Sequence, residues 1–171
     1  RARESALIDA ALDHLKERYR IGRFALTGQS GGGHVVAALL TLRTDIDCAV
    51  MTSGVLSVRQ RARMHGWKTD ITGYRDYWDP VDHVDRIAED RKRRIFIVGD
   101  PLDKNTPFET QLAYYDAVAA AGHPVGLLRA KGKGKARHSL NFTGFKVAKW
   151  CLDGLPAEDM QARLAEASPA E

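Results

Sequence analysis

The sequence has few cysteines, few aromatic residues and no long apolar run. Its 171 residues include only Cys48 and Cys151, too few for a disulfide framework or a cysteine metal site. No stretch approaches the roughly 18 consecutive apolar residues of a membrane-spanning helix. We therefore expect no metal or other cofactor and no membrane partner. We expect both cysteines to be buried thiols that act as small hydrophobic side chains.

The chain also lacks an excess of one charge. Its 26 Lys and Arg residues against 22 Asp and Glu residues give a net charge of +4, and the basic residues are scattered. This pattern argues against nucleic acid as a partner. Apolar residues make up 44% of the chain, which excludes a disordered chain and is enough for a core. We expect a single domain over residues 1–171.

A secretory signal peptide is also missing, which favours a cytoplasmic location. The chain opens at Arg1, inside a predicted helix, rather than at a methionine. Arg1 is therefore not taken as the native start.

Helical and strand-like segments alternate along most of the chain. Residues 24–27, 48–53, 94–98 and 125–128 are predicted strands, and helices are predicted over 2–18, 32–42, 107–121, 141–152 and 156–167. Such alternation predicts an α/β fold: a mostly parallel sheet of about four strands with helices on both faces. Residues 57–90 are polar and irregular, and we interpret them as a cap-like insertion.

A Gly-x-Ser-x-Gly turn joins the first strand to the second helix. Ser30 lies between Gly28 and Gly32, in the strand–turn–helix context of a nucleophile elbow. A Cβ atom at either glycine is expected to clash in so tight a turn. We predict that Ser30 is a nucleophile and that the amide of Gly31 donates to an oxyanion. A phosphate-binding loop is disfavoured, because a Walker loop requires a lysine where His34 stands.

A serine nucleophile needs a base and a third group that orients the base. The carboxyl ends of parallel strands converge, so these partners should follow later strands. Asp100 and Asp103 follow the strand at 94–98, and His138 follows the strand at 125–128. We predict Asp103 as the acid because it lies further round its turn, and His138 as the base. Asp100 is expected to shape the turn.

Further side chains are candidates for the wall of a substrate pocket. Gln29 lies in the elbow, and three aromatic residues, Trp67, Tyr74 and Trp78, lie in the irregular segment. For the aromatic residues, packing of the loop over the helices is the alternative. His34, near the first turn of the second helix, is expected to pack or to be exposed.

Together these motifs resemble the α/β-hydrolase superfamily, and within it the prolyl-oligopeptidase-like serine hydrolases. The resemblance covers the elbow at 28–33, the segment 77–84, the acid loop at 99–107, and the helix that ends at Ala121-Gly122 before a strand and His138. It implies the C-terminal catalytic part of such a hydrolase, with Ser30, Asp103 and His138 as its triad. Asp79 stands where the family has serine before proline, and Arg137 where it usually has glycine before the histidine.

The resemblance also implies strands that this chain lacks. An α/β-hydrolase has several strands before the elbow strand, and a loop among them supplies the second oxyanion donor. Losing one donor costs roughly 2.7–4 kcal/mol of transition-state stabilisation. Without those strands, residues 24–27 form a bare apolar sheet edge. We expect an N-terminal half of the same protein, or a second chain, to cover this edge, with an edge-to-edge homo-oligomer as the next candidate.

The leading expectation is a serine hydrolase that cleaves an ester, thioester or amide bond through an acyl-enzyme. Peptidases of the family usually carry an N-terminal propeller that this chain lacks, so a small ester or acyl substrate is slightly favoured over a peptide. A non-catalytic interaction module with the same fold is the alternative.

Overall fold

Four parallel strands form one sheet in the computed structural model, which describes residues 2–69, 73, 77–89, 92–140 and 142–167. The strands lie side by side in chain order. They are β1 (Phe24–Gln29), β2 (Ile46–Thr52), β3 (Arg94–Gly99) and β4 (Val125–Arg129). All four strands confirm sequence predictions.

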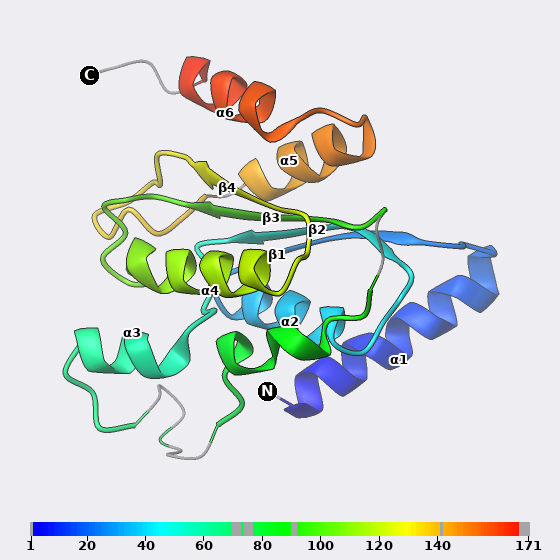
Figure 1. The fold of residues 1–171 in the computed structure, drawn as a ribbon, viewed down its shortest axis with the longest axis horizontal. Coiled ribbons are helices and arrows are strands. Elements are labelled where there is room, and N and C mark those ends of the chain that lie inside the picture. Colours follow the sequence, from blue (N-terminus) through cyan, green and yellow to red (C-terminus); the bar gives the residue numbers. More distant parts are fainter. Residues whose placement is uncertain (1, 70–72, 74–76, 90–91, 141, 168–171) are drawn as a thin grey trace.

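Helices cover both faces of the sheet (Figure 1). One face carries α1 (Ala2–Tyr19), α2 (Gly31–Leu40) and α4 (Phe108–Ala120), and the other carries α5 (Thr143–Leu152) and α6 (Ala157–Glu166). This arrangement confirms the predicted α/β class and matches a partial α/β-hydrolase fold. Within the described ranges, no helix is long and apolar enough to cross a membrane.

The two central strands are buried on both faces, as their continuous apolar sequences predict. Alternate residues of β2 and β3 contribute to two separate cores. Ala49, Met51, Ile95 and Ile97 pack toward α2 and α4, whereas Cys48, Val50, Phe96 and Val98 pack toward α5 and α6. The strands are therefore held rigidly, and the loops at their carboxyl ends have a fixed base.

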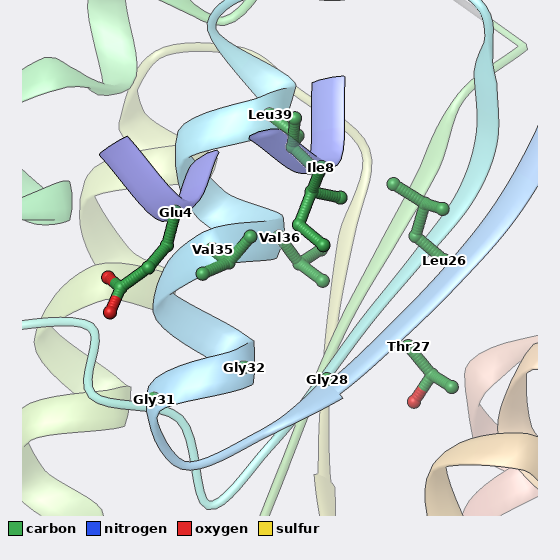
Figure 2. Close-up of a pocket in the computed structure, with 10 residues that line it drawn as sticks. All are labelled: Glu4, Ile8, Leu26, Thr27, Gly28, Gly31, Gly32, Val35, Val36 and Leu39. Carbon is green, nitrogen blue, oxygen red and sulfur yellow. The ribbon is translucent and has the colours of Figure 1, made fainter. Parts of the chain in front are cut away.

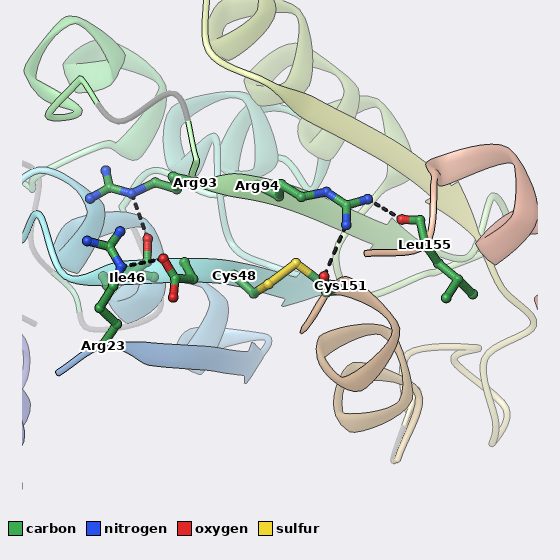
Figure 3. The surroundings of a disulfide bond; sticks show 8 residues. Arg23, Ile46, Cys48, Arg93, Arg94, Cys151 and Leu155 are labelled. Atoms are coloured by element: carbon green, nitrogen blue, oxygen red, sulfur yellow. Dashed lines mark hydrogen bonds and ion pairs between the residues drawn. A yellow bond between two sulfur atoms is a disulfide. The ribbon is translucent and has the colours of Figure 1, made fainter. Parts of the chain in front are cut away.

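The two cysteines form a disulfide between β2 and α5 (Figure 3). Both are buried, as predicted, but the expectation of free thiols is wrong. The bond joins Cys48 and Cys151 across 103 residues of sequence, with their Cα atoms 6.1 Å apart. Only the packing of α5 on β2 brings them together, so the spacing of the two cysteines in the sequence does not predict the bond. Disulfides are typical of oxidising compartments.

A short helix, α3 (Val58–Met64), begins the segment that the sequence predicts to be irregular. The prediction of an irregular segment is therefore wrong for these residues. The helix was missed because its sequence is mostly polar and shows no helical period. The helix starts where a buried carboxylate from a distant residue holds it. Asp79 accepts hydrogen bonds from the amides of Val58 (2.9 Å) and Arg59 (3.0 Å). A 3₁₀ helix, η1 (Pro80–Arg86), begins directly after Asp79.

The edge of the sheet at β1 is less covered than the centre. All six residues of β1 are half-buried, and within the described ranges β1 pairs only with β2. In α1 the residues Ser5 and Leu12 are buried, whereas large apolar side chains remain exposed at Leu7, Ile8, Leu15 and Tyr19. One helix that flanks the edge therefore has a bare apolar face.

Candidate active site

Ser30 occupies a strained turn between β1 and α2. Its φ is 55° and its ψ is −117°, a region that residues other than glycine rarely adopt. The backbone holds it there at two points. Its amide donates to the carbonyl of Thr52 (3.0 Å), and its carbonyl accepts from the amide of Val55 (3.1 Å). The elbow is thus tied to the carboxyl end of β2.

The glycines of the turn have unequal roles. A Cβ atom at Gly28 would collide with the carbonyl group of Gly32, as predicted. At Gly32 itself a Cβ atom would meet nothing within 4 Å, so the predicted clash there is wrong. The reason is that the carbonyl group of Gly32, and not its Cβ position, faces Gly28. Gly33 is the second crowded position, where a Cβ atom would lie 2.9 Å from Gly54 Cα.

The predicted acid and base lie in direct contact. Asp103 Oδ2 is 2.9 Å from His138 Nδ1. The other carboxylate oxygen, Oδ1, accepts from the amides of Asn105 (2.8 Å) and Thr106 (2.9 Å). The backbone therefore fixes the carboxylate, which in turn fixes the imidazole with Nδ1 toward it. Nε2 is the nitrogen left to serve a reacting group.

The contacts of Asp103 keep it ionised. Burial by itself raises the pKa of this carboxyl group. The hydrogen bonds from His138 and from the amides of Thr106 and Asn105 outweigh burial and bring the pKa below its usual value. Asp103 is therefore placed to orient an imidazole.

In the described ranges, no group of three or more His, Cys, Asp or Glu side chains is arranged to hold a metal ion.

Gln29 links the elbow to the histidine segment. Its Oε1 accepts a hydrogen bond from the amide of Leu140 at 3.1 Å, across 111 residues of sequence. Leu140 lies two residues after His138, and Gln29 lies directly before Ser30. Together with the contact between Asp103 and His138, this bond joins the loops that follow β1, β3 and β4 at their carboxyl ends. The sequence places Gln29 in a substrate pocket, and the side chain proves to be a clamp between two loops.

Asp100 has a larger role than the predicted turn residue. Its Oδ1 does accept from the amide of Leu102 (2.8 Å), which is the expected turn. Its Oδ2 also accepts from the amide of Gly132 and from Arg137, in the loop that carries His138. The sequence gives one indication of this contact, the arginine that stands where the family usually has glycine.

The aromatic pocket candidates pack against histidines. Trp67 stacks on His65 with ring centroids 4.3 Å apart, and Trp78 stacks on His83 at 4.9 Å. Trp78 also meets buried His34 edge-on at 5.4 Å, which fits the expectation that His34 packs. Tyr74 lies outside the described residues.

Trp78 and His34 line a cavity of about 180 Å³ together with Ser5, Ala38, Thr41, Leu42 and Arg86. Ser30, Asp103 and His138 are not part of this lining.

A larger groove, about 640 Å³, runs beside the elbow (Figure 2). It lies between α1, β1 and α2, and it is mostly apolar. Its lining residues are Glu4, Ile8, Leu26, Thr27, Gly28, Gly31, Gly32, Val35, Val36 and Leu39. The groove therefore connects the bare edge of the sheet with Gly31, the predicted oxyanion donor.

A parallel sheet with a serine elbow after β1, an acid after β3 and a histidine after β4 defines the α/β-hydrolase class. The family model of the prolyl oligopeptidase family matches residues 7–151. The chain therefore belongs to the prolyl oligopeptidase family.

Solved structures share this fold at low sequence identity. The acylaminoacyl peptidase of Pyrococcus horikoshii superposes with a TM-score of 0.68 at 13% identity, over 91% of this chain and 29% of that one. An esterase of Pyrococcus furiosus gives 0.63 at 15% identity, over 94% and 62%. A puromycin-hydrolyzing peptidase of Mycobacterium tuberculosis gives 0.61 at 17% identity, over 91% and 23%.

Such identities show the fold alone. No curated relative matches the chain in sequence. The chain spans 26–29% of the length of the acylaminoacyl peptidases it matches.

Proposed function

We propose that this chain carries the nucleophile, base and acid of a hydrolase that cleaves an ester, thioester or amide bond through an acyl-enzyme. Ser30 is the nucleophile, His138 the base and Asp103 the residue that orients the base. The observation that carries the proposal is the 2.9 Å contact between Asp103 and His138. The bond from Leu140 to Gln29 supports it, because it holds the histidine segment against the elbow.

The chemistry follows from these positions. Ser30 Oγ attacks the carbonyl carbon while His138 Nε2 takes the hydroxyl proton. The carboxylate of Asp103 stabilises the imidazolium, which then gives its proton to the leaving group. The amide of Gly31 donates to the oxyanion. Water releases the acyl group by the same steps in reverse.

A small ester or acyl substrate is the preferred substrate class, and a peptide is the second. The P. furiosus esterase shares the fold over 94% of this chain and the P. horikoshii peptidase shares it over 91%, so both substrate classes are tested. Full-length protein assayed with p-nitrophenyl acetate and with an acylated aminoacyl-aminomethylcoumarin distinguishes the two classes. Faster turnover of the coumarin amide would favour a peptidase.

We also propose that the edge of β1 is covered by an N-terminal half of the same protein. Apolar side chains are exposed on helices at both faces beside this edge. On α1 these include Leu7 and Ile8, and on α5 they include Phe145 (64% exposed) and Leu152 (61%). Further strands with flanking helices would bury both sets, and they would bring a second N–H donor to the groove beside Gly31. A second copy of the chain, paired edge to edge, is the alternative occupant.

Labelling of the full-length protein with a fluorophosphonate tests the proposed function. The reagent should modify Ser30, and Ser30→Ala should abolish both labelling and hydrolysis. Activity that survives in Ser30→Ala contradicts the assignment. Lack of labelling in folded full-length protein favours a non-catalytic interaction module.

A further inference from the structure

The residue directly before His138 has an unfavourable backbone conformation. Arg137 has a φ of 55°, and a residue other than glycine is disfavoured in this left-handed region. One backbone contact defines the turn, the hydrogen bond from the Arg137 amide to the carbonyl of Gly134 (3.0 Å). Surrounding contacts must hold a strained residue in place. The side chain of Arg137 provides such a contact.

That side chain binds a carboxylate from the acid loop. Arg137 Nε is 2.6 Å from Asp100 Oδ2, and the side chain of Asp100 is fully buried. The same oxygen accepts from the amide of Gly132 at 2.5 Å. A charge-assisted hydrogen bond to a buried carboxylate is stronger than a neutral one. Asp100 therefore holds the histidine loop at two points, one on either side of its turn.

The loop itself is closely packed. A Cβ atom at Gly132 would collide with the carbonyl group of Arg137. The amide of Lys133 donates to the carbonyl of Ser139 (2.7 Å), and the amide of Lys104 donates to the carbonyl of Ala136 (2.8 Å). The histidine loop is thus folded onto the acid loop, so a shift of Arg137 would move His138 with it.

We propose that the ion pair between Asp100 and Arg137 positions His138 for catalysis. The pair holds Arg137 in its strained conformation, and this directs the imidazole toward Asp103. One loop then supplies two carboxylates with separate tasks: Asp103 orients the imidazole and Asp100 fixes the backbone that carries it. Both are positioning residues that act through His138. The inference rests on the proposed function of His138 as the base.

Arg137→Gln in the full-length protein tests the pair, with p-nitrophenyl acetate as substrate. A misplaced base slows the chemical step, so kcat should fall roughly tenfold or more while KM stays within about twofold. Asp100→Asn should act in the same way. The double variant should be little worse than the more severe single variant, because both changes break one interaction. Lys135→Gln removes an exposed charge from the same loop and is the matched control.

Arg137→Gly separates the strain from the ion pair. Glycine adopts a positive φ without strain, so this variant should keep more of kcat than Arg137→Ala, which loses the pair and retains the strain. A purely structural contribution would lower the melting temperature of both variants and leave kcat of the folded protein unchanged. These two variants also decide the matter if Asp100→Asn does not fold.

The outcomes distinguish this inference from the function beneath it. Wild-type protein that neither reacts with a fluorophosphonate nor hydrolyses the ester overturns both. Active wild-type protein together with folded Arg137→Gln and Arg137→Ala variants of unchanged kcat overturns the positioning role alone. An equal loss of kcat in Lys135→Gln also overturns it, since the effect would then come from loop charge.

Discussion

Gln29 and Leu140 are joined by a hydrogen bond of 3.1 Å that connects the serine elbow with the histidine loop. The bond joins a side chain next to Ser30 to an amide two residues beyond His138. This bond thus holds together two loops that are 111 residues apart in sequence. The position of His138 relative to Ser30 depends on this contact as well as on the contact between Asp103 and His138.

Gln29→Leu should therefore slow the reaction without preventing folding. Loss of the clamp lets the histidine loop shift relative to Ser30, and we expect kcat to fall on the order of tenfold. Gln161→Leu is the matched control, because Gln161 also binds backbone, at Arg129 of β4. It should lower stability by a similar amount and leave kcat unchanged. Equal kcat losses in the two variants would remove the special role of Gln29.

The ionisation of Asp103 predicts how stability depends on pH. Hydrogen bonds from His138 and two amides keep the pKa of this carboxyl group below its usual value in spite of burial. The unfolded carboxyl group has a pKa of about 3.9, so the stabilisation is fully present above that pH. It is lost as pH falls through the lower pKa of the folded state.

Urea unfolding of wild-type protein and Asp103→Asn between pH 2 and 7 checks this. The difference in unfolding free energy should be largest near neutral pH and should shrink below about pH 4. A difference that stays constant over the whole range would show that the ionised form contributes nothing.

The sequence predicts more of the fold than of the contacts that refine the site. Strands and long helices were predictable because apolar period and glycine position are local signals. The strained turn at Ser30 and the contact between Asp103 and His138 were predictable, because each of these residues follows a strand. The short helix α3 was not, since the carboxylate that holds its first amides belongs to Asp79, far along the chain.

The pairing of Asp100 with Arg137 and of Cys48 with Cys151 was hidden for a related reason. Each pair joins two loops or elements that only the tertiary fold brings together. Local sequence patterns contain no information on such partners. They do show where a residue departs from the family, and Asp79 and Arg137 are both departures that prove to make specific contacts.

Asp79 accepts hydrogen bonds from the first amides of α3, and this role can be tested with serine, the residue that the family has at this position. Asp79→Ala leaves the buried amide of Val58 and the part-buried amide of Arg59 without this acceptor and should cost about 1–2 kcal/mol. Asp79→Ser keeps a side-chain oxygen that can accept one of these bonds, so it should cost less. The unfolding free energy of the two variants in urea measures the difference. Equal losses would show that the amides do not need this acceptor.

The disulfide should stabilise the fold with little influence on catalysis. It joins Cys48, the third residue of β2, to Cys151, the next-to-last residue of α5 (Figure 3). The residues of the candidate site follow the carboxyl ends of their strands instead. A bridge that closes a long loop typically contributes about 2–4 kcal/mol by restricting the unfolded chain. The variant Cys48→Ala/Cys151→Ala should unfold at a lower temperature and keep its kcat. Thiol titration of denatured wild-type protein should find no free thiol unless a reductant is added.

The bare edge of the sheet at β1 predicts that another segment or a second chain packs against it. Leu26 lies in the groove between α1, β1 and α2 (Figure 2). A lysine there would place a charge in an apolar contact if another segment covers the edge. In the full-length protein, Leu26→Lys should expose the groove to a hydrophobic dye and lower kcat, because a second oxyanion donor would no longer be held beside Gly31. Met64→Lys, on an exposed residue of α3, is the control and should do neither.

If Leu26→Lys instead converts a dimer into a monomer in light scattering, the edge is covered by a second copy of the chain. If it changes neither dye binding, kcat nor mass, the edge of β1 is open in the native protein.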